Sequence, residues 1–297
     1  MQRYWGYILI LVAASGWGMV GPLCLYCIKA GMTPVEIAFW RALIGGCLLC
    51  AHAAFTGTLH LQSGRDGLAL FVFGALCIAG MFGAFQSAVQ QGGAALAVIL
   101  MYTVPVWVAV ASRIIFKEIL TRVKLLAIGI SLGGVVFISL SGSTGVEAVT
   151  PTAVFLGLAS GFLYSGHYIF SKFFLNRYSP FALYGCSMLS AALVCLPFAD
   201  LSMERVYAAW APLLFLCAVC SYVSYWTYSE GLKRVEPTRA VILASVDPMV
   251  GILAAWLWWD EFFSPSGWVG AALILVAVFL IITDGGKAPA RAGRFER

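Results

Sequence analysis

The sequence predicts an all-α integral membrane protein, with ten transmembrane helices arranged as two inverted five-helix repeats around a central cavity. Three observations predict this fold. First, 62% of the 297 residues are hydrophobic and 10% are charged, whereas soluble domains are about 45–50% apolar. Second, lysine and arginine fall almost entirely on one side of the predicted helices. Third, one nine-residue motif occurs in both halves of the chain.

The predicted helices are defined by length and apolar composition. About 20 mostly apolar residues cross the ~30 Å hydrocarbon layer, and ten segments meet that condition, which leaves little chain for a soluble domain. The first segment differs from a signal peptide because its apolar stretch is long, it has no clear small-residue cleavage site, and further spans follow. We predict spans at approximately 5–28, 35–55, 68–90, 94–116, 123–141, 152–173, 180–199, 210–230, 238–259 and 265–283.

The distribution of basic residues sets the orientation, since lysine and arginine accumulate in cytoplasmic loops. With the N-terminus inside, fifteen of the eighteen basic residues lie on the inner side, Lys29 and Arg205 lie outside, and Arg41 lies within a helix. One helix more or fewer would exchange the sides of all later charges. We therefore predict a multi-pass inner-membrane protein with both termini cytoplasmic. The net charge of +5 then fits contact with anionic lipid, not nucleic acid.

The repeated motif is AVILMYTVP at residues 97–105 and AVILASVDP at residues 240–248. The spacing around it is also repeated, because Glu118 and Glu261 each lie thirteen residues after the proline of their copy. The two copies differ in that the second has an aspartate, Asp247, next to its proline.

A second pair of similar motifs lies near the start of each half, where ASGW at 14–17 corresponds to ASGF at 159–162. Helices 1–5 thus correspond to helices 6–10. Since five is odd, the second copy enters the membrane from the opposite side, as in many secondary transporters. We predict one repeat over 1–145, an inverted repeat over 146–284, and a basic cytoplasmic tail over 285–297.

In the first half, two features of the helices have open interpretations. Arg41 lies about six residues into helix 2 from the outside, shallow enough to snorkel; it orients or packs the helix, or it binds a substrate carboxylate. Pro105 in helix 4 bends the helix statically or serves as a hinge.

Gly129 and Gly133 offer helix 5 a small face for close packing. The candidate substrate-binding residues are Ser15 and Trp17 in helix 1, Gln86 in helix 3 and Tyr102 in helix 4.

In the second half, polar and aromatic side chains form stripes. Five such residues of helix 6 share one face, at i, i+4, i+7, i+8 and i+11. A polar face is costly in lipid, so this one should face the protein interior. Aromatic walls stack on apolar ligands and attract ammonium groups by about 0.5–2 kcal/mol per contact. The stripes are Ser160, Tyr164, His167, Tyr168 and Ser171 in helix 6, and Tyr222, Tyr225 and Trp226 in helix 8; the tyrosines, His167 and Trp226 are candidate substrate-binding residues.

Helix 9 carries Asp247, about 12 Å in from the cytoplasmic boundary at ~1.5 Å per residue. An aspartate at the centre of a membrane helix costs roughly 2.5–3.5 kcal/mol, so it usually faces a cavity or a partner. Asp247 is therefore a candidate ammonium or proton site, or it forms a structural hydrogen bond. Pro248 and Pro105 occupy equivalent places and are candidate paired hinges. Helix 10 has a small face of Gly267, Gly270 and Ala271.

Other chemistry is not indicated. The nine cysteines include three CxxC pairs, but each lies in an apolar span, where cysteine behaves as a small hydrophobe. The sequence has no phosphate-binding loop of the type G-x-x-x-x-G-K-[ST] and no spaced nucleophile, base and oxyanion set. We expect neither an enzyme nor a bound metal or cofactor.

These features together resemble the drug/metabolite transporter superfamily, specifically its ten-helix EamA-type members. SGWG at 15–18, Arg41 and the two AVIL-to-proline-to-glutamate frames carry the resemblance, which covers roughly 5–283. It implies a metabolite exporter, often of amino acids, with a cavity lined by helices 1, 3, 4, 6, 8 and 9. The aromatic amino-acid exporters are similar in size and aromatic richness. Proton-coupled multidrug relatives have a glutamate in the first helix, and this chain has none there.

The sequence therefore predicts an inner-membrane transporter that exports amino acids, including aromatic or other amphiphilic ones, and related metabolites by alternating access. The alternative is a proton-coupled exporter of organic cations. The expected partners are a small-molecule substrate and membrane lipid, without nucleic acid, and the expected assembly is a monomer or weak homodimer.

Overall fold

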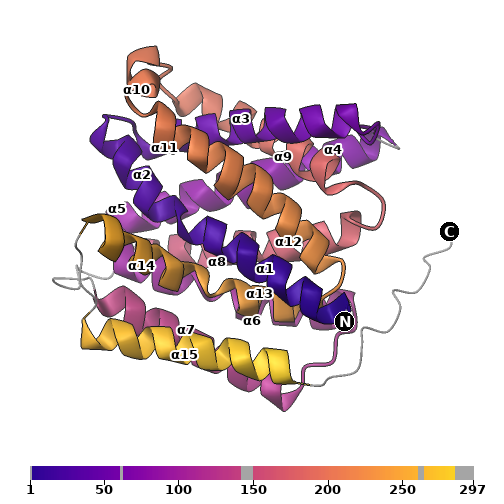
Figure 1. The fold of residues 1–297 in the computed structure, drawn as a ribbon, viewed down its shortest axis with the longest axis vertical. Helices are drawn as coiled ribbons and strands as arrows, with labels where there is room; N and C mark the ends of the chain where they lie inside the picture. Colours follow the sequence, from indigo (N-terminus) through magenta and orange to yellow (C-terminus); the bar gives the residue numbers. More distant parts are fainter. Residues whose placement is uncertain (1, 61–62, 142–149, 260–263, 285–297) are drawn as a thin grey trace.

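The computed structural model describes residues 2–60, 63–141, 150–259 and 264–284, and every regular element within them is a helix (Figure 1). Residues outside these ranges include Glu261 of the predicted repeat and the basic tail. The elements are α1 (Gln2–Gly18), α2 (Val20–Lys29), α3 (Pro34–Phe55), α4 (Gly64–Phe73), the π-helical η1 (Gly74–Gly80), α5 (Met81–Met101), α6 (Val104–Ile115), α7 (Arg122–Ser141), α8 (Pro151–Phe174), α9 (Pro180–Cys195), the 3₁₀ turn η2 (Leu196–Phe198), α10 (Met203–Ala208), α11 (Trp210–Phe215), the π-helical η3 (Leu216–Val223), α12 (Ser224–Leu232), α13 (Pro237–Ala244), α14 (Asp247–Trp259) and α15 (Pro265–Thr283).

Nine stretches of the described chain are long and apolar enough to span a membrane, which confirms an all-helical, multi-pass fold. Eight of the nine correspond closely to predicted spans, and Gly64–Gly92 extends predicted helix 3 toward the N-terminus of the chain. The predicted ninth helix, 238–259, is divided into α13 and α14, which are each too short to be counted. The number of ten helices stays a prediction.

Four of the long helices begin in the same way, with a serine or threonine followed by proline. The side chain before the proline accepts a hydrogen bond from the backbone N–H three residues later, which satisfies one of the free donors of the first turn. Proline fits the next position because its missing N–H would have no partner there. The pairs are Thr33–Pro34, Thr150–Pro151, Ser179–Pro180 and Ser264–Pro265.

Helices of the first half pack mainly on helices of the second half. The principal pairs are α1 with α12, α3 with α9, α5 with α8, and α7 with α15. Helix α1 runs antiparallel to α12, since a Cβ on Gly6 would lie 2.7 Å from Val235 and one on Gly16 would lie 2.1 Å from Ser224. Two of these pairs, α3 with α9 and α7 with α15, join helices that correspond in the predicted repeat, and the inverted repeat stays a prediction.

The end of the bundle where α1 begins and α15 ends is here called the N-terminal end (Figure 1). Val235 lies there beside Gly6, and Arg239 lies there because it donates to the carbonyl of Ile281. Under the predicted orientation, this end is cytoplasmic. The opposite end is called the distal end.

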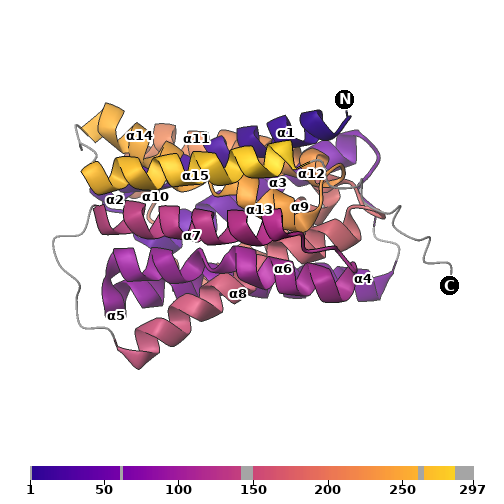
Figure 2. The ribbon, with the colours of Figure 1, turned by 90° about the horizontal axis from the view of Figure 1, so that it is seen from below.

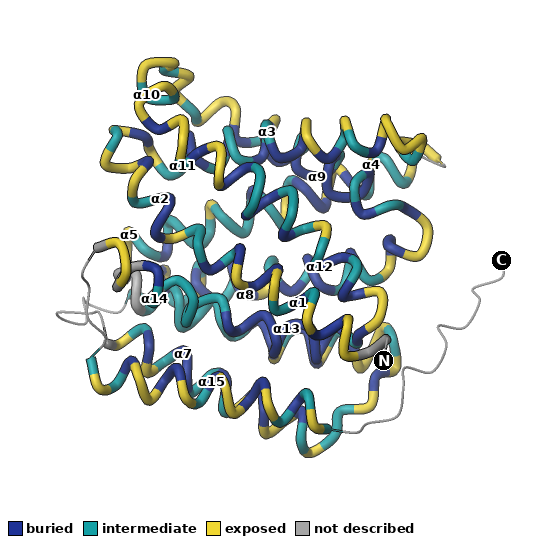
Figure 3. The backbone as a smooth tube through the Cα atoms, viewed as in Figure 1, coloured by how far each residue is buried: buried dark blue, intermediate teal, exposed yellow. Residues whose placement is uncertain are grey.

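The pair α7 and α15 forms one edge of the molecule (Figures 1 and 2). A Cβ on Gly270 would lie 2.5 Å from the carbonyl oxygen of Gly134, so these glycines allow the two helices to approach closely. The small face of α15 thus packs within the chain, whereas a Cβ on Gly129 would meet no atom within 4 Å. The outer faces of both helices are exposed and apolar (Figure 3), as expected of surfaces that contact lipid.

Two helix breaks lie at equivalent places of the repeated motif. The chain leaves helical geometry at Tyr102 and Thr103, between α5 and α6, and at Ser245 and Val246, between α13 and α14. Pro105 and Pro248 follow directly, in the first turn of the next helix, where proline removes no helical hydrogen bond. The prolines therefore mark the breaks, and their predicted role as hinges stays a prediction.

The π-helical segments also occupy equivalent places. η1 lies in the third helix of the first half, and η3 lies in the third helix of the second half. The serine hydroxyls of η3 and α12 donate to carbonyls five residues earlier, from Ser221 to Leu216 and from Ser224 to Val219. Segments of π-helix are rare in proteins, and those that occur are often found at functional sites. Both segments of this protein lie beside the cavity described next.

Candidate functional site

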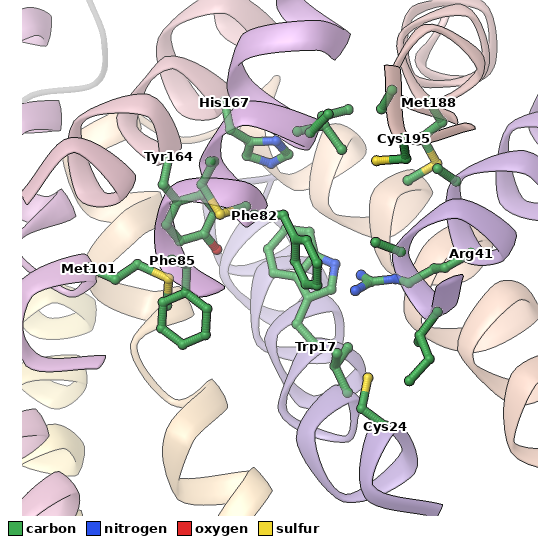
Figure 4. Close-up of a pocket in the computed structure, with 18 of the residues that line it drawn as sticks. Trp17, Cys24, Arg41, Phe82, Phe85, Met101, Tyr164, His167, Met188 and Cys195 are labelled. Atoms are coloured by element: carbon green, nitrogen blue, oxygen red, sulfur yellow. The ribbon is translucent and has the colours of Figure 1, made fainter. Parts of the chain in front are cut away.

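A cavity of about 280 Å³ lies between helices of the two halves (Figure 4). Its walls come from α1, α2, α3, η1, α5, α8, α9, α12 and α14, together with Tyr102 at the first helix break. Lining residues Cys24, Ile37 and Cys195 lie near the distal ends of their helices. The cavity therefore extends from the helix breaks toward the distal end of the bundle.

The side toward the N-terminal end is filled. Tyr168, Tyr184 and Tyr228 lie below the cavity and are each at most 1% exposed. Beyond them lies α13, all of whose residues are buried (Figure 3). The cavity is thus closed toward the N-terminal end in this conformation.

Asp247 contributes the negative charge of the cavity. It is the first residue of α14, and its Oδ1 accepts a 2.6 Å hydrogen bond from the hydroxyl of Tyr102. No ion pair joins Asp247 to a basic side chain in the described residues. The backbone of α1 approaches the same break, since a Cβ on Gly18 would lie 2.5 Å from the Asp247 carbonyl oxygen.

Arg41 contributes the positive charge. Its Nε donates a 3.0 Å hydrogen bond to Oγ of Ser221, which in turn donates to the carbonyl of Leu216 in the π-helical segment η3. The guanidinium reaches toward the indole of Trp17 in the middle of the cavity (Figure 4). The indole N–H of Trp17 is buried and has no hydrogen-bond partner among the described residues.

The apolar wall comes mainly from the third helix. Ile78, Met81, Phe82 and Phe85 follow one another at i, i+3, i+4 and i+7, so they share one face, and Met101 lies beside Phe85 (Figure 4). From the sequence we predicted the amide of Gln86 as a binding group, and this apolar face was not predicted. The helical spacing of its large apolar residues was the available signal, although lipid-facing helices show the same pattern.

His167 lies at the floor of the cavity within an aromatic cluster. Its ring centroid is 5.7 Å from Trp17, 5.5 Å from Tyr225 and 5.0 Å from Tyr228. Its Nε2 lies 3.3 Å from the hydroxyl of Tyr184. The predicted inward polar face of helix 6 is buried as expected, but only part of it reaches the cavity.

The structure brings together six of the predicted substrate-binding residues. From both halves of the chain, the cavity is lined by Trp17, Tyr102, Tyr164, His167, Tyr225 and Asp247. Five others lie outside the lining. Ser15 is exposed and donates to the carbonyl of Leu11, Gln86 is half-buried, and Tyr168 is packed behind Tyr164 and His167.

The remaining two, Tyr222 and Trp226, belong to a separate aromatic cluster. The hydroxyl of Tyr222 lies 2.6 Å from Nδ1 of His52, whose ring stacks on Phe181 at a centroid distance of 3.7 Å. Trp226 lies 5.9 Å from the same phenylalanine. They face away from the cavity because the helical face that carries Tyr225 and Tyr228 points inward instead.

A buried network of charges lies at the N-terminal end. Lys124 Nζ lies 2.8 Å from Glu118 and 2.7 Å from Glu236, and Arg239 lies 3.0 Å from Glu236 and 2.6 Å from Asp284. The side chains of Lys124 and Arg239 are 2% and 4% exposed. Glu118 and Lys124 come from the first half, and the other three come from the second. The network therefore ties the halves together at the end where the cavity is closed.

Comparison with protein families gives one consistent result. A model of the EamA-like transporter family matches residues 4–140 and again residues 151–283. The chain is 29% identical to an uncharacterized transporter of Archaeoglobus fulgidus, over 94% of this chain and 96% of that protein. It is 25% identical to the uncharacterized inner membrane transporter YicL of Salmonella typhimurium, over 94% and 95%.

Two further similarities bear on function and fold. A probable amino-acid metabolite efflux pump of Salmonella typhimurium is 24% identical, over 94% of this chain and 95% of that protein. A crystal structure superposes with a TM-score of 0.78 at 18% identity, covering 93% of this chain and 95% of the other. At that identity, the superposition supports the fold alone.

Proposed function

The chain belongs to the EamA-like transporter family, and from that premise we propose that it exports amino acids and related amphiphilic metabolites across the inner membrane by alternating access. The observation that carries the proposal is the cavity itself. It lies between the two halves at the level of both helix breaks, it is walled by aromatic side chains, and it is closed toward the N-terminal end.

One-sided access is what alternating access requires of any single conformation. With the N-terminal end in the cytoplasm, the conformation described here faces outward. The inward-facing conformation then requires α13 to move away from α8, and it requires Tyr168 on α8, Tyr184 on α9 and Tyr228 on α12 to separate from one another. The ion pair of Lys124 with Glu236 joins the two halves across that path, so it must break or rearrange during transport.

The composition of the cavity supports an amphiphilic substrate. Trp17, Phe82 and Phe85 offer flat apolar surfaces, and Tyr164 adds a hydroxyl. Aromatic side chains stack on apolar groups and attract ammonium groups. The name of the Salmonella efflux pump, a relative at low identity, supports amino-acid metabolites as the substrate class and export as the direction.

The presence of the Asp247 carboxylate in the cavity favours the alternative function, a proton-coupled exporter of organic cations. A buried carboxylate can bind a cation or a proton in turn. The same carboxylate also suits the ammonium group of an amino acid, so the two functions are separated by experiment.

The test is uptake into proteoliposomes of the purified protein, with radiolabelled amino acids and a quaternary ammonium dye, each with and without a pH gradient. We expect amino-acid uptake without a gradient, and a reduction in Trp17→Ala and His167→Ala. Trp5→Ala is the control, because Trp5 lies on the same helix and is 61% exposed. Dye movement that requires a gradient and is lost in Asp247→Asn would replace this proposal with the cation exporter.

A further inference from the structure

We propose that Arg41 and Asp247 form a two-point site that selects zwitterions, with Arg41 binding the carboxylate and Asp247 the ammonium group of an amino acid that has an apolar side chain. The inference rests on the proposed function, because it takes this cavity as the transport site. It goes further by assigning Arg41 a role in recognition and by excluding simple organic cations as preferred substrates.

The two charges share a cavity without pairing with each other. The ion pairs of the described residues lie in the network at the N-terminal end, in the pairs of Glu230 with Lys233 and Arg234, and in the pairs of Arg205 with the buried Glu36 and with Asp200. Arg41 and Asp247 are absent from those pairs although both line the cavity. An unpaired charge within a membrane protein is costly, so it usually faces a pathway or a ligand.

Each charged side chain forms a hydrogen bond with one neutral hydroxyl group, and that bond uses one atom of the charged group. Ser221 accepts from Nε of Arg41, and Tyr102 donates to Oδ1 of Asp247. The terminal nitrogens of the guanidinium form no hydrogen bond with a described residue, so this planar fork remains for a ligand. Guanidinium groups bind carboxylates through two parallel hydrogen bonds, which are among the stronger ones in proteins.

The space around the charges completes the match. Trp17 and Phe82 lie beside the guanidinium, and Phe85 lies farther along the same cavity beside Met101 (Figure 4), so an apolar side chain of the substrate has an apolar wall. A cation without a carboxylate would leave Arg41 unpaired and repelled, and an anion without an amine would do the same to Asp247. Repulsion of this kind is a common source of specificity.

The test measures binding to the purified protein with three ligands that share one aromatic ring: L-phenylalanine, phenethylamine, which lacks the carboxylate, and 3-phenylpropanoate, which lacks the amine. Isothermal titration calorimetry gives each affinity. For the wild type, we expect phenylalanine to bind at least about tenfold tighter than either analogue, since each loses a charge-assisted pair.

The variants separate the two points. Arg41→Gln should remove the preference for phenylalanine over phenethylamine, and Asp247→Asn should remove the preference for phenylalanine over 3-phenylpropanoate. Arg177→Gln is the matched control, since Arg177 is exposed and lies outside the cavity. Ser221→Ala removes only the anchor of Arg41 and should reduce the same preference less, by about threefold to tenfold; it serves as the test if Arg41→Gln unfolds.

Two results would overturn the inference. One is an unchanged preference for phenylalanine over phenethylamine in folded Arg41→Gln, including an equal loss of both ligands, and the other is tighter wild-type binding of phenethylamine than of phenylalanine. If proteoliposomes of Arg41→Gln still move amino acids with wild-type selectivity, the proposed function stands and only the two-point site fails. If the wild type neither binds nor moves amino acids, the proposed function itself fails.

Discussion

The hydroxyl of Tyr102 donates a 2.6 Å hydrogen bond to Oδ1 of Asp247, 145 residues further along the chain. Tyr102 lies at the helix break of the first half, and Asp247 lies directly after the break of the second. The bond therefore connects the two places where helices are interrupted inside the cavity. A change in the position of one break would be transmitted to the other through this contact.

Tyr102→Phe keeps the ring and removes only this bond. We expect a loss of about tenfold in transport at low substrate concentration, because a hydrogen bond to a charged group contributes roughly 1.5–3 kcal/mol. The measurement is initial uptake into proteoliposomes over a range of substrate concentrations. Tyr4→Phe, at a residue 60% exposed on α1, should behave as wild type. Equal activity of both variants would show that the bond is dispensable.

Glu236→Gln removes the charge that Lys124 and Arg239 share at the N-terminal end. Breaking a buried ion pair by removing one partner costs about 3–5 kcal/mol, so we expect a clear fall in the melting temperature of the purified protein. Glu230→Gln makes the same chemical change in a partly exposed group that pairs with Lys233 and Arg234. That control should change stability by about 1 kcal/mol or less, and similar effects of the two variants would argue against a special role for the network.

Gly18→Ala tests the approach of α1 to the second helix break. The added Cβ would lie 2.5 Å from the carbonyl oxygen of Asp247 and 2.7 Å from Val250. Because backbone cannot yield easily, we expect destabilisation of about 1–3 kcal/mol and reduced transport. Gly21→Ala, at a position where a Cβ meets no atom within 4 Å, should be tolerated. The readouts are thermal unfolding and uptake, and a fully active, stable Gly18→Ala protein would contradict the packing.

The orientation is tested by reporters fused to the C-terminus. The basic residues of the loops favour the inner side, so we expect a fluorescent protein fused after Arg297 to fluoresce in cells and alkaline phosphatase fused at the same place to be inactive. As an independent check, a cysteine-specific impermeant reagent should label Arg205→Cys from outside intact cells and should not label Arg177→Cys. The opposite labelling would reverse the topology and the assignment of the outward-facing state.

Several site residues could be predicted because they are rare in apolar segments. Asp247 and His167 stand out as ionisable residues in largely apolar helices, and both line the cavity. Phe82 and Phe85 do not stand out, because a phenylalanine that faces lipid and one that faces a cavity follow the same helical pattern. Gln86 was predicted for its polarity, but one position along a helix is a turn of about 100°, and the apolar neighbour lies on the lining instead.

The role of Arg41 could not be predicted from the sequence for a different reason. Its depth in the helix allowed both a packing role and a role in binding a carboxylate, and no sequence pattern distinguished them. The decisive contact is with Ser221, 180 residues away, in a π-helical segment that propensities do not predict. The buried ion pair of Lys124 with Glu236 could not be predicted from the sequence either. Charged residues in loops are normally expected to be solvated, and these two become buried only because the loops of both halves pack together.

Composition, the repeated motif and the distribution of basic residues were enough to predict a membrane protein of helices and its approximate spans, because the bilayer imposes length and polarity on each helix separately. The family was predicted from a resemblance carried by SGWG at 15–18, Arg41 and the two AVIL frames. The lining of the cavity depends on which face of each helix turns inward, and its closed end depends on charges from both halves. Those properties arise only when the helices pack against one another, since they are relations between residues far apart in the chain.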